Sequence, residues 1–578
     1  LNNVATIGYN DKGLSVHSLI NGTPVSDEVK DGAGNTLSQS SYSGGSSQSS
    51  SASYDGFGRK TKSNSTTNGA IMYNSSYSYD GSGNIVSSNT NGYDGINVSS
   101  SSSYDLLGNT LSSSMTIAGL GSHSSRSNTY NAVGQLTSVK NQLGQSKSLS
   151  YNKDGELISV KDYDGSTFSY SYDADGNQLS SSHNGITTSN SYDVVGNLLS
   201  TTNPEGTIKY SYTKTGRLTS ANYPGGMIVG YSYDGHDLLT GKNSAVGMST
   251  SYSHDKYGRV TGISTPQSNI SYSYQDGALT NGKYGALGGV NLTDGGKSIT
   301  KHSYTYGDWD AITQDAIIQG AHKITIGYAF DKRQKLINQT ISSDLKDSSL
   351  NMEKVFSYNS LSQLLNSTAL YHEESGTTTK VSEAYKYDIN GNILSHIKDG
   401  ITTTYQYNAI DQLTAVDKVT ISYDKAGNLL KDPDGNEYSY NGLNQLTAVK
   451  YGKSLTNYSY YPDGLLRNKQ SVGSNLSFYY DSGHADGIDA TINGVRTKDS
   501  FLLSGSGTPV ASYRNNIANY YLKAGNSTVG MLNSNSELVN SYKYQDYGTV
   551  NLTEGFAHVE LDPILAEIIV VNEENPIK

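Results

Sequence analysis

Cysteine is absent from this 578-residue sequence, and tryptophan occurs only once. The absence of cysteine excludes disulfide bridges, cysteine-based zinc sites and thiol catalysis, although it does not fix the compartment. Long apolar runs are also missing, because the longest, Ile568–Val571, is far shorter than the ~18 residues that a membrane helix needs. Apolar residues make up 34% of the chain, below the roughly 45–50% of globular domains. We therefore expect no membrane-spanning segment and only a thin core.

Basic clusters are lacking as well. The net charge is −11 and no run of Lys or Arg stands out, which argues against a nucleic-acid partner. The chain opens LNNVATIGYN, without Met and without a basic-then-apolar leader, so we expect a mature or excised piece of a protein.

Tyrosine, by contrast, is abundant, with 48 copies. Low hydrophobicity alone would indicate disorder. Each tyrosine, however, can bury a large ring while its hydroxyl stays in water. The tyrosines are also spaced regularly, which disordered polar tracts have no reason to be. These two features predict a folded chain whose thin core is rich in tyrosine.

The regular spacing comes from a repeated motif, Tyr-[Asp/Asn]-x-x-Gly. Strong copies start at Tyr9, Tyr54, Tyr79, Tyr104, Tyr130, Tyr151, Tyr172, Tyr192, Tyr387 and Tyr423. Looser copies put another residue in the glycine slot, namely Asp237, Gln334, Ser362, Asp411 or Asn444. Between Tyr130 and Tyr274 the starts fall 20 or 21 residues apart, and a fixed period in this range is typical of repeat architectures.

Each period also carries a second turn signal, such as Asn184-Gly185 or Asp399-Gly400. Asn-Gly and Asp-Gly between alternating segments are strong hairpin signals, because tight hairpin turns need positive φ. One period is therefore two strands and two turns, with about seven residues or roughly 24 Å per strand. The fold class predicted is all-β, built from repeated long antiparallel hairpins.

The motif residues have separate structural roles in this prediction. Tyr170 and Tyr172 are two apart and share one face of a strand, so stacked hairpins would align such pairs in ladders. The Asp caps the turn through its own backbone and the glycine supplies the unusual φ. The clearest copies give the structural repeat residues Tyr54, Asp55, Gly58, Tyr79, Asp80, Gly83, Tyr172, Asp173, Gly176, Tyr192, Asp193, Gly196, Tyr387, Asp388, Gly391, Tyr423, Asp424 and Gly427.

The strength of the repeat divides the chain into four parts. Residues 1–275 form a first repeat array, 276–356 a degenerate or inserted region, 357–470 a second array, and 471–578 a C-terminal part. The region around 281–356 departs most from the repeat and contains Trp309, so a short helix or an insertion is possible there.

The segments YDADGNQL, YDVVGNLL, YDKAGNLL and YDGFGRK resemble the YD-repeat or Rhs-repeat family, over most of the chain. The resemblance implies a spiralling β-sheet shell, or a β-solenoid-like barrel, around a closed chamber. In bacterial polymorphic toxins and Tc toxins of this family the chamber holds a C-terminal toxin domain. In teneurins a similar barrel belongs to a cysteine-rich adhesion receptor, which the lack of cysteine here disfavours.

This sequence departs from the toxin-type pattern near its end. Lys523-Ala524 replaces the usual His-Asp before Gly525-Asn526, so no role is carried onto these positions. The chain reaches Asn575-Pro576 without the glycine-rich core signature, and Asp562-Pro563 does not match that signature. We therefore expect a chain truncated before the protease core, or a shell-only relative, and assign no catalytic residue.

Some of the turn residues also suit other chemistry. Paired carboxylates suit a glycosidase, but the same Asp recurs in every copy while an active site needs one special pair. Asp432-x-Asp434-Gly435 resembles the start of a calcium loop, yet Glu437 comes too early to complete one. Gly295-Gly296-Lys297-Ser298 lacks the first glycine of a phosphate loop. We expect no metal, no cofactor and no enzymatic site.

The leading hypothesis is a non-enzymatic shell of a secreted bacterial toxin system, enclosing a C-terminal toxin domain absent from this chain. An extracellular or cell-surface adhesive protein that forms filaments is the alternative. A carbohydrate-binding or carbohydrate-active β-repeat protein is a weaker one, because aromatic faces stack on sugars. The expected partners are a toxin cargo or the protein's own copies, with a cell-surface glycan as a further possibility.

Overall fold

In the computed structural model, antiparallel β-strands make up nearly all of the regular structure. The structure describes residues 5–9, 15–20, 22–43, 46–124, 126–275, 285–307, 311–345, 350–372, 376–481, 483–514, 517–525, 527–544, 546–548 and 550–552. Within these ranges there is no α-helix, and a 3₁₀ turn, η2, lies at Asp546–Gly548. The all-β prediction is confirmed.

The strands form three hydrogen-bonded sheets in which each strand pairs with its neighbours in the chain. The first sheet contains β1 (Ala5–Tyr9), β2 (Ser15–Ile20), β3 (Thr23–Lys30), β4 (Thr36–Ser43), β5 (Ser46–Tyr54), β6 (Lys60–Thr67), β7 (Ala70–Tyr79), β8 (Ile85–Gly92), β9 (Asn97–Tyr104), β10 (Thr110–Ile117) and β11 (Gly121–Ser124). The second contains β12 (Ser127–Tyr130), β13 (Leu136–Lys140), β14 (Ser146–Tyr151), β15 (Leu157–Lys161), β16 (Thr167–Tyr172), β17 (Gln178–His183), β18 (Ile186–Tyr192), β19 (Leu198–Asn203), β20 (Gly206–Tyr212), β21 (Leu218–Tyr223), β22 (Met227–Tyr233), β23 (Leu239–Asn243), β24 (Ser249–His254), β25 (Val260–Ser264), β26 (Ser268–Gln275), β27 (Ala286–Asp294), β28 (Lys297–Tyr306), β29 (Ile312–Gln319), β30 (His322–Phe330), β31 (Leu336–Ser343), β32 (Met352–Tyr358), β33 (Leu364–His372), β34 (Thr378–Tyr387), β35 (Ile393–Lys398), β36 (Ile401–Tyr407), β37 (Leu413–Val416) and β38 (Val419–Thr420). The third contains β39 (Ser422–Tyr423), β40 (Leu429–Lys431), β41 (Glu437–Tyr440), β42 (Leu446–Tyr451), β43 (Ser454–Tyr460), β44 (Leu466–Ser471), β45 (Ser474–Asp481), β46 (His484–Ile492), β47 (Val495–Leu503), β48 (Pro509–Arg514), β49 (Ile517–Ala524), β50 (Ser527–Asn533), β51 (Leu538–Tyr544) and β52 (Val550–Leu552).

The sequence pattern explains why these segments are strands. In β16, TFSYSY, polar residues and aromatic rings alternate, and so do exposed and half-buried positions. The register shifts by one residue just before Tyr172, because the Tyr-Asp turn begins there, and the same shift precedes Tyr192 and Tyr212. This local irregularity, recurring in successive repeats, fits the bulges that increase the twist of a sheet.

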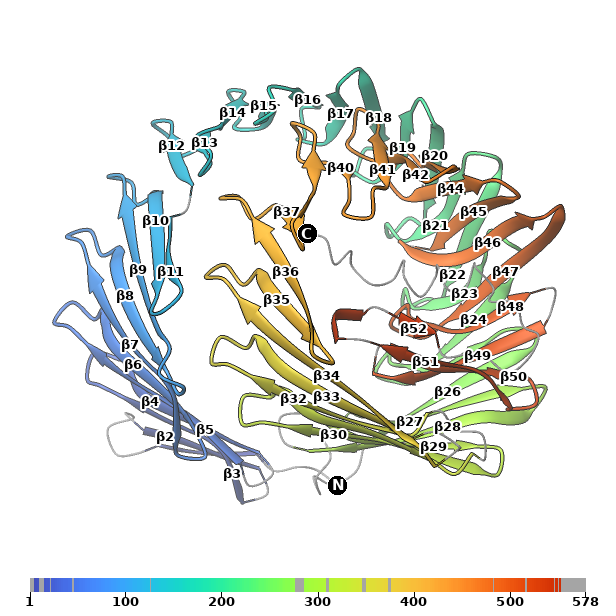
Figure 1. The fold of residues 1–578 in the computed structure, drawn as a ribbon, viewed down its shortest axis with the longest axis horizontal. Coiled ribbons are helices and arrows are strands. Elements are labelled where there is room, and N and C mark those ends of the chain that lie inside the picture. Colours follow the sequence, from blue (N-terminus) through green and yellow to red (C-terminus); the bar gives the residue numbers. More distant parts are fainter. Residues whose placement is uncertain are drawn as a thin grey trace.

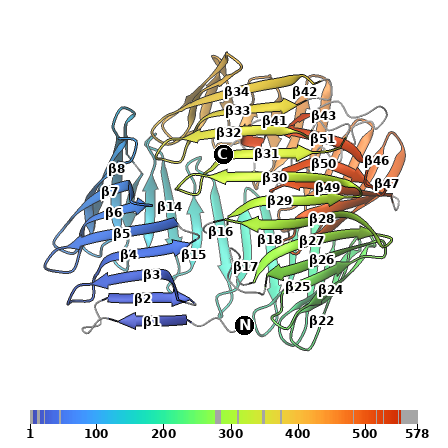
Figure 2. The same cartoon turned by 90° about the horizontal axis from the view of Figure 1, so that it is seen from below.

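Region 276–356 continues the same meander within its described residues. It contains β27 to β31 and the start of β32, each paired with its neighbours, and Figure 2 shows β26 to β34 as one ladder. No helix occurs among the residues described in this region, and Trp309 lies outside them. The hydrogen-bonded sheets are interrupted near residues 125–126 and 421 instead. The four-part division drawn from the sequence stays a prediction.

The meander winds into a spiral of about two coils. We call β1–β26 the first coil and β27–β52 the second coil. Figure 1 shows the first coil curving from β2 to β26, and the strands β40–β50 lying alongside β18–β28. Contacts between the coils join residues roughly one circuit apart: Tyr93 with Tyr358, 265 positions on, and Arg467 with Glu205, 262 positions back.

The fully buried core lies where β43–β50 overlap the end of the first coil and the start of the second. Three clusters there combine residues of β20–β31 with residues of β43–β50, centred on Ile208 with Phe501, Ile263 with Leu502, and Ile324 with Leu522. The expected tyrosine core is therefore corrected for most motif tyrosines, although Tyr387 is buried and Tyr223, Tyr461 and Tyr520 belong to the core clusters. Rings such as Tyr172 are only half-buried, because one sheet face alone cannot cover them, and full burial occurs where a second layer is present.

Candidate functional site: the repeat turns and the seam between the coils

The Tyr-Asp turn is a closed hydrogen-bond unit. In the copy at Asp173, the carboxylate oxygen Oδ1 accepts from the backbone N–H groups of Asp175 and Asn177, both at 2.9 Å. The other oxygen, Oδ2, accepts from the Asn177 side chain at 2.9 Å. The Asn177 side-chain and backbone donors hold the pKa of Asp173 below its ordinary value. Gly176 has φ +85°, which this turn requires.

The structure places all the predicted repeat residues in this same unit. Tyr54, Tyr79, Tyr172, Tyr192, Tyr387 and Tyr423 each end a strand. The carboxylates that accept from the residue four positions on are Asp55, Asp80, Asp173, Asp193, Asp388 and Asp424. The glycines with positive φ are Gly58, Gly83, Gly176, Gly196, Gly391 and Gly427.

The loose copies form the same turn with a residue other than glycine in the glycine slot. Asp237, Gln334, Ser362, Asp411 and Asn444 all have φ between 61° and 65°, so the slot imposes the left-handed conformation even without glycine. Where Asn replaces the Asp, the fifth residue of the turn becomes an acceptor. The Asn131 side chain, for example, donates to Gln135 Oε1 at 2.8 Å. In these copies the first and fifth turn residues are thus matched as acceptor with donor, or as donor with acceptor.

The motif tyrosines connect each repeat to the preceding one. The hydroxyl of Tyr172 donates to the backbone oxygen of Leu157 at 2.9 Å, and that of Tyr192 donates to Gln178 at 3.0 Å. Tyrosines of successive repeats are separated by an intervening strand, or roughly 9.6 Å at ~4.8 Å per strand. The tyrosines of the predicted ladders are therefore linked by hydrogen bonds from their hydroxyls to the intervening strand.

The recurring carboxylates are occupied by their own turns. At the calcium-loop-like stretch, Asp432 accepts from the Asn436 side chain at 2.7 Å and from the Tyr438 hydroxyl at 2.8 Å. Among the described residues, no cluster of three or more His, Asp or Glu side chains is arranged to hold a metal ion. Nor does any helix in that part of the chain have the length and apolar character to cross a membrane.

A buried ionic cluster joins the coils at β23. Lys242 Nζ lies 2.8 Å from Asp486 Oδ1 and 3.0 Å from Asp481 Oδ2, and the Lys242 and Asp486 side chains are almost inaccessible. The Tyr231 hydroxyl donates to Asp481 at 2.6 Å. Burial opposes the charge of Lys242, but Asp486 and Asp481 outweigh it, so the pKa of Lys242 is raised. The position of the second coil relative to the first therefore depends on these charged side chains.

A second ionic cluster holds the last described segment of the chain. Asp546 of η2 lies 2.5 Å from Lys354 Nζ through Oδ1, and both side chains are buried. Ser367 donates to the other Asp546 oxygen. Tyr547 beside it meets the Tyr387 hydroxyl at 2.5 Å and packs edge-on against Tyr385. These partners lie on β32–β34, and we call this group the terminal clasp.

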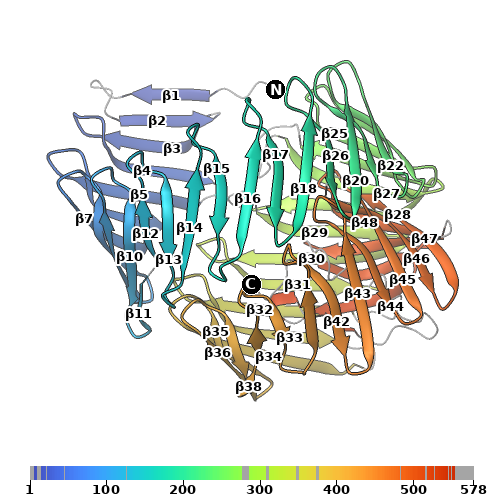
Figure 3. The ribbon, with the colours of Figure 1, turned by 90° about the horizontal axis from the view of Figure 1, so that it is seen from above.

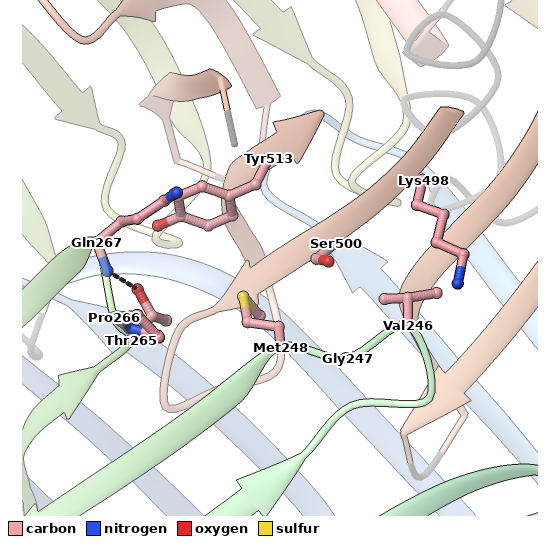
Figure 4. Close-up of a pocket in the computed structure, with 9 residues that line it drawn as sticks. All are labelled: Val246, Gly247, Met248, Thr265, Pro266, Gln267, Lys498, Ser500 and Tyr513. Carbon is pink, nitrogen blue, oxygen red and sulfur yellow. Dashed lines mark hydrogen bonds between the residues drawn. The ribbon is translucent and has the colours of Figure 1, made fainter. Parts of the chain in front are cut away.

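A small pocket opens near the Lys242 ionic cluster, at the seam where the two coils meet (Figure 4). It is lined by Val246, Gly247, Met248, Thr265, Pro266, Gln267, Lys498, Ser500 and Tyr513, from two turns of the first coil and from β47 and β48. The lining contains no carboxylate and no histidine.

Sequence reasoning missed the residues that join the coils. Lys242 and Asp486 lie outside the motif, and Asp546 occupies a variable position of the loose copy that starts at Tyr544. Another signal was available at the fourth position before the motif tyrosine. Serine stands there in Ser75 and Ser100, whereas Ile208 and Val229 stand there in the overlapped strands and are fully buried. In these copies the aliphatic residues lie where a second layer covers the sheet.

Coiled sheets of Tyr-Asp hairpins define a class, the YD-repeat shells. The family model described as Teneurin YD-shell matches residues 130–241 and 290–555, well over half of the chain, and the RHS Repeat model matches residues 233–270. The chain therefore belongs to the teneurin YD-shell family.

Individual relatives match shorter segments. The chain is 27% identical over 211 residues to the tRNA3(Ser)-specific nuclease WapA of Bacillus spizizenii, covering 35% of this chain and 9% of the relative. It is 34% identical over 107 residues to Teneurin-1 of Homo sapiens, covering 18% of this chain and 4% of the relative. The chain thus spans less than a tenth of the length of these relatives.

Solved structures extend the likeness of the fold to most of the chain. A crystal structure of TcdB2-TccC3 has a TM-score of 0.56 at 13% identity, covering 95% of this chain and 36% of that one. A crystal structure of TcdB2-TccC3 without its hypervariable C-terminal region has a TM-score of 0.57 at 14% identity, with coverages of 95% and 35%. At such identities the likeness shows the fold alone. The predicted YD-repeat and Rhs-repeat resemblance is confirmed.

Proposed function

We propose that this chain is a non-enzymatic shell of a secreted bacterial toxin system, and that it encloses a toxin domain attached to its C-terminal end. Its role is sequestration. The wall protects the cell that makes the toxin by separating the toxin domain from its targets until the shell opens. A sheet whose coils are sealed against each other leaves few free edges through which a cargo could escape.

The observation that carries this proposal is the path of the chain's last described segment. Most contacts between the coils join residues about 240–267 positions apart, but the terminal clasp joins Ser367 with Asp546, only 179 apart, and Tyr387 with Tyr547, 160 apart. The segment has therefore left the spiral early. Figure 1 shows β51 and β52 on the inner side of the curve traced by β22–β28. A domain that follows would start from the concave side.

The chemistry of the wall supports a passive role. The motif carboxylates are bound within their turns, and the buried ionic clusters hold the coils together. The name of the WapA relative describes a nuclease, and this chain matches 9% of that protein. We assign any such activity to a separate enclosed domain, not to these residues.

A protection experiment tests the proposal. A small ribonuclease is fused after Lys578 and, as the matched control, before Leu1, and both fusions are treated with protease. We expect the C-terminal ribonuclease to resist cleavage and to show activity only after the shell is unfolded, while the N-terminal one is cleaved and active. Equal cleavage of the two reporters would contradict enclosure. Recovery of the native protein from culture medium tests secretion.

A further inference from the structure

The turn that follows a motif tyrosine and the turn at the other end of that strand lie on different borders of the sheet. Because the meander alternates, all Tyr-Asp turns lie on one border of the coiled sheet, which we call the Tyr-Asp rim. The remaining turns lie on the other border, the opposite rim. In Figure 3 the Tyr-Asp ends of β16 and β18 stand at the upper border, and the second coil lies toward the other ends of these strands.

The seam between the coils joins one rim to the other. Ser360, in a Tyr-Asp-type turn of the second coil, donates its backbone N–H to Asp94 in an opposite-rim turn of the first coil, at 2.6 Å. Asn390, in another Tyr-Asp-type turn, contacts His123 of the short strand β11 at 3.1 Å, and Gly442 accepts from His183, the last residue of β17. At these places the contact is directional: the Tyr-Asp rim of one coil docks on the opposite rim of the coil before it.

Docking covers the tips of the second coil's Tyr-Asp turns. Leu361, Ile389 and Leu443 occupy the two variable tip positions of these turns, and all three are partly buried. The same tip positions in the first coil are bare. Leu106 and Val194 are fully exposed, and similar tips are Phe57, Leu107, Val133 and Val195.

The other end of the molecule has a matching bare border. The opposite rim of the second coil is the counterpart of the surface on which the first seam forms. Its turns also present apolar side chains to solvent, among them Ile401, Tyr451, Val472, Val495 and Ile517, with Val472 93% exposed. Exposed apolar groups gathered along a border are typical of interaction sites.

We propose that these two bare rims bind each other between copies of this chain, so that the Tyr-Asp rim of one molecule's first coil docks on the opposite rim of another molecule's second coil. The intramolecular seam is the template, because it joins the same two kinds of turn in the same direction. The two surfaces differ and lie at opposite ends of the molecule, so the contact is heterologous and adds copies end to end. The inference does not depend on an enclosed cargo.

Two rim variants and one matched control test the proposal. Leu106→Asp with Val194→Asp blocks the Tyr-Asp rim, and Tyr451→Asp with Val472→Asp blocks the opposite rim. The control, Tyr73→Asp with Val355→Asp, adds the same charge at exposed sites in the middle of β7 and β32, away from both rims. Circular dichroism and thermal unfolding verify that each variant folds, and sedimentation velocity gives the mass over a wide concentration range.

The expected result is specific to a heterologous contact. The wild type and the control grow in integer multiples of the monomer mass as concentration rises, whereas each rim variant alone stays monomeric. An equimolar mixture of the two rim variants forms a dimer and nothing larger, because each supplies the one rim that the other lacks. A wild type that stays monomeric throughout would overturn the proposal. So would a rim variant that assembles by itself, or a mixture that fails to dimerise.

Discussion

Lys242 and Asp486 lie 244 positions apart in the chain and form an ion pair of 2.8 Å with neither side chain exposed beyond 2%. The pair spans the seam, since Lys242 is on β23 of the first coil and Asp486 on β46 of the second. Buried ion pairs are poor sources of net stability, but removing one partner leaves an uncompensated charge. The position of the second coil therefore depends on both partners being present.

Substitution Lys242→Met is expected to destabilise the protein by about 3–5 kcal/mol, because it leaves Asp486 and Asp481 buried without their cation. The control is Lys450→Met, which removes an exposed, solvent-screened pair with Glu437 and should leave the stability nearly unchanged. Chemical denaturation measures both. In the Lys242→Met variant, protection from hydrogen exchange should be lost first in β44–β47. Equal stabilities for the two variants would show that the cluster does not hold the seam.

Glycines two positions apart in one turn provide a test of backbone strain. Gly83 has φ +92°, whereas Gly81 has no positive φ, and no atom lies within 4 Å of the place that a Cβ would take there. Gly83→Ala should cost about 1–2 kcal/mol of unfolding free energy, since alanine is strained there. Gly81→Ala should be neutral or stabilise by up to ~1 kcal/mol, by restricting the unfolded chain. Thermal unfolding measures the difference.

The converse substitution at a loose copy should stabilise the protein. Gln334 occupies the glycine slot with φ +63°. Gln334→Gly removes the strain of a left-handed non-glycine residue, for an expected gain of about 1 kcal/mol. The same change at Gln339, which lies in the extended strand β31, serves as the control and should destabilise by roughly 0.5–1 kcal/mol. A destabilised Gln334→Gly variant would show that the side chain, and not the backbone, decides this slot.

The turns and strands could be predicted from the sequence because the residues that form each turn are close together in the chain. Asp173, Gly176 and their equivalents form a turn within five residues, so their spacing predicts both the turn and the strands around it. The seam could not be predicted in the same way. Lys242 and Asp486 meet only because the coil returns after about 240 residues, and that distance depends on the summed twist of many strands. Small errors in twist per strand would misplace the meeting point entirely.

Acid should weaken the Tyr-Asp turns. The Asn177 donors lower the pKa of Asp173, and the equivalent donors lower the pKa of Asp80 and Asp193. A carboxyl whose pKa is depressed by folding stabilises the native state above its unfolded pKa, and this contribution is lost as pH falls through the folded pKa. Stability should therefore decline below about pH 4.

The turn at Asn131 and Gln135 supplies the control for this acid effect, because it closes through an uncharged pair. Converting the charged turn with Asp173→Asn and Asn177→Gln should abolish the acid-induced rise in hydrogen exchange at residues 173–177. Exchange at residues 193–197, whose charged turn is unchanged, should still rise. If the converted turn opens with acid to the same extent as its neighbour, titration of Asp173 is not the cause.

The terminal clasp should decide whether the last described segment stays on β32–β34. Asp546→Asn removes the charge that compensates the buried Lys354, so the segment is expected to detach while the coils stay folded. If the substitution costs about 3 kcal/mol of local stability, limited proteolysis within residues 538–552 should accelerate roughly a hundredfold. The control Asp489→Asn breaks a pair with the exposed Arg496 and should leave cleavage in that segment unchanged. Similar cleavage rates in the two variants would mean that packing of Tyr547 against Tyr385, rather than the ion pair, retains the segment.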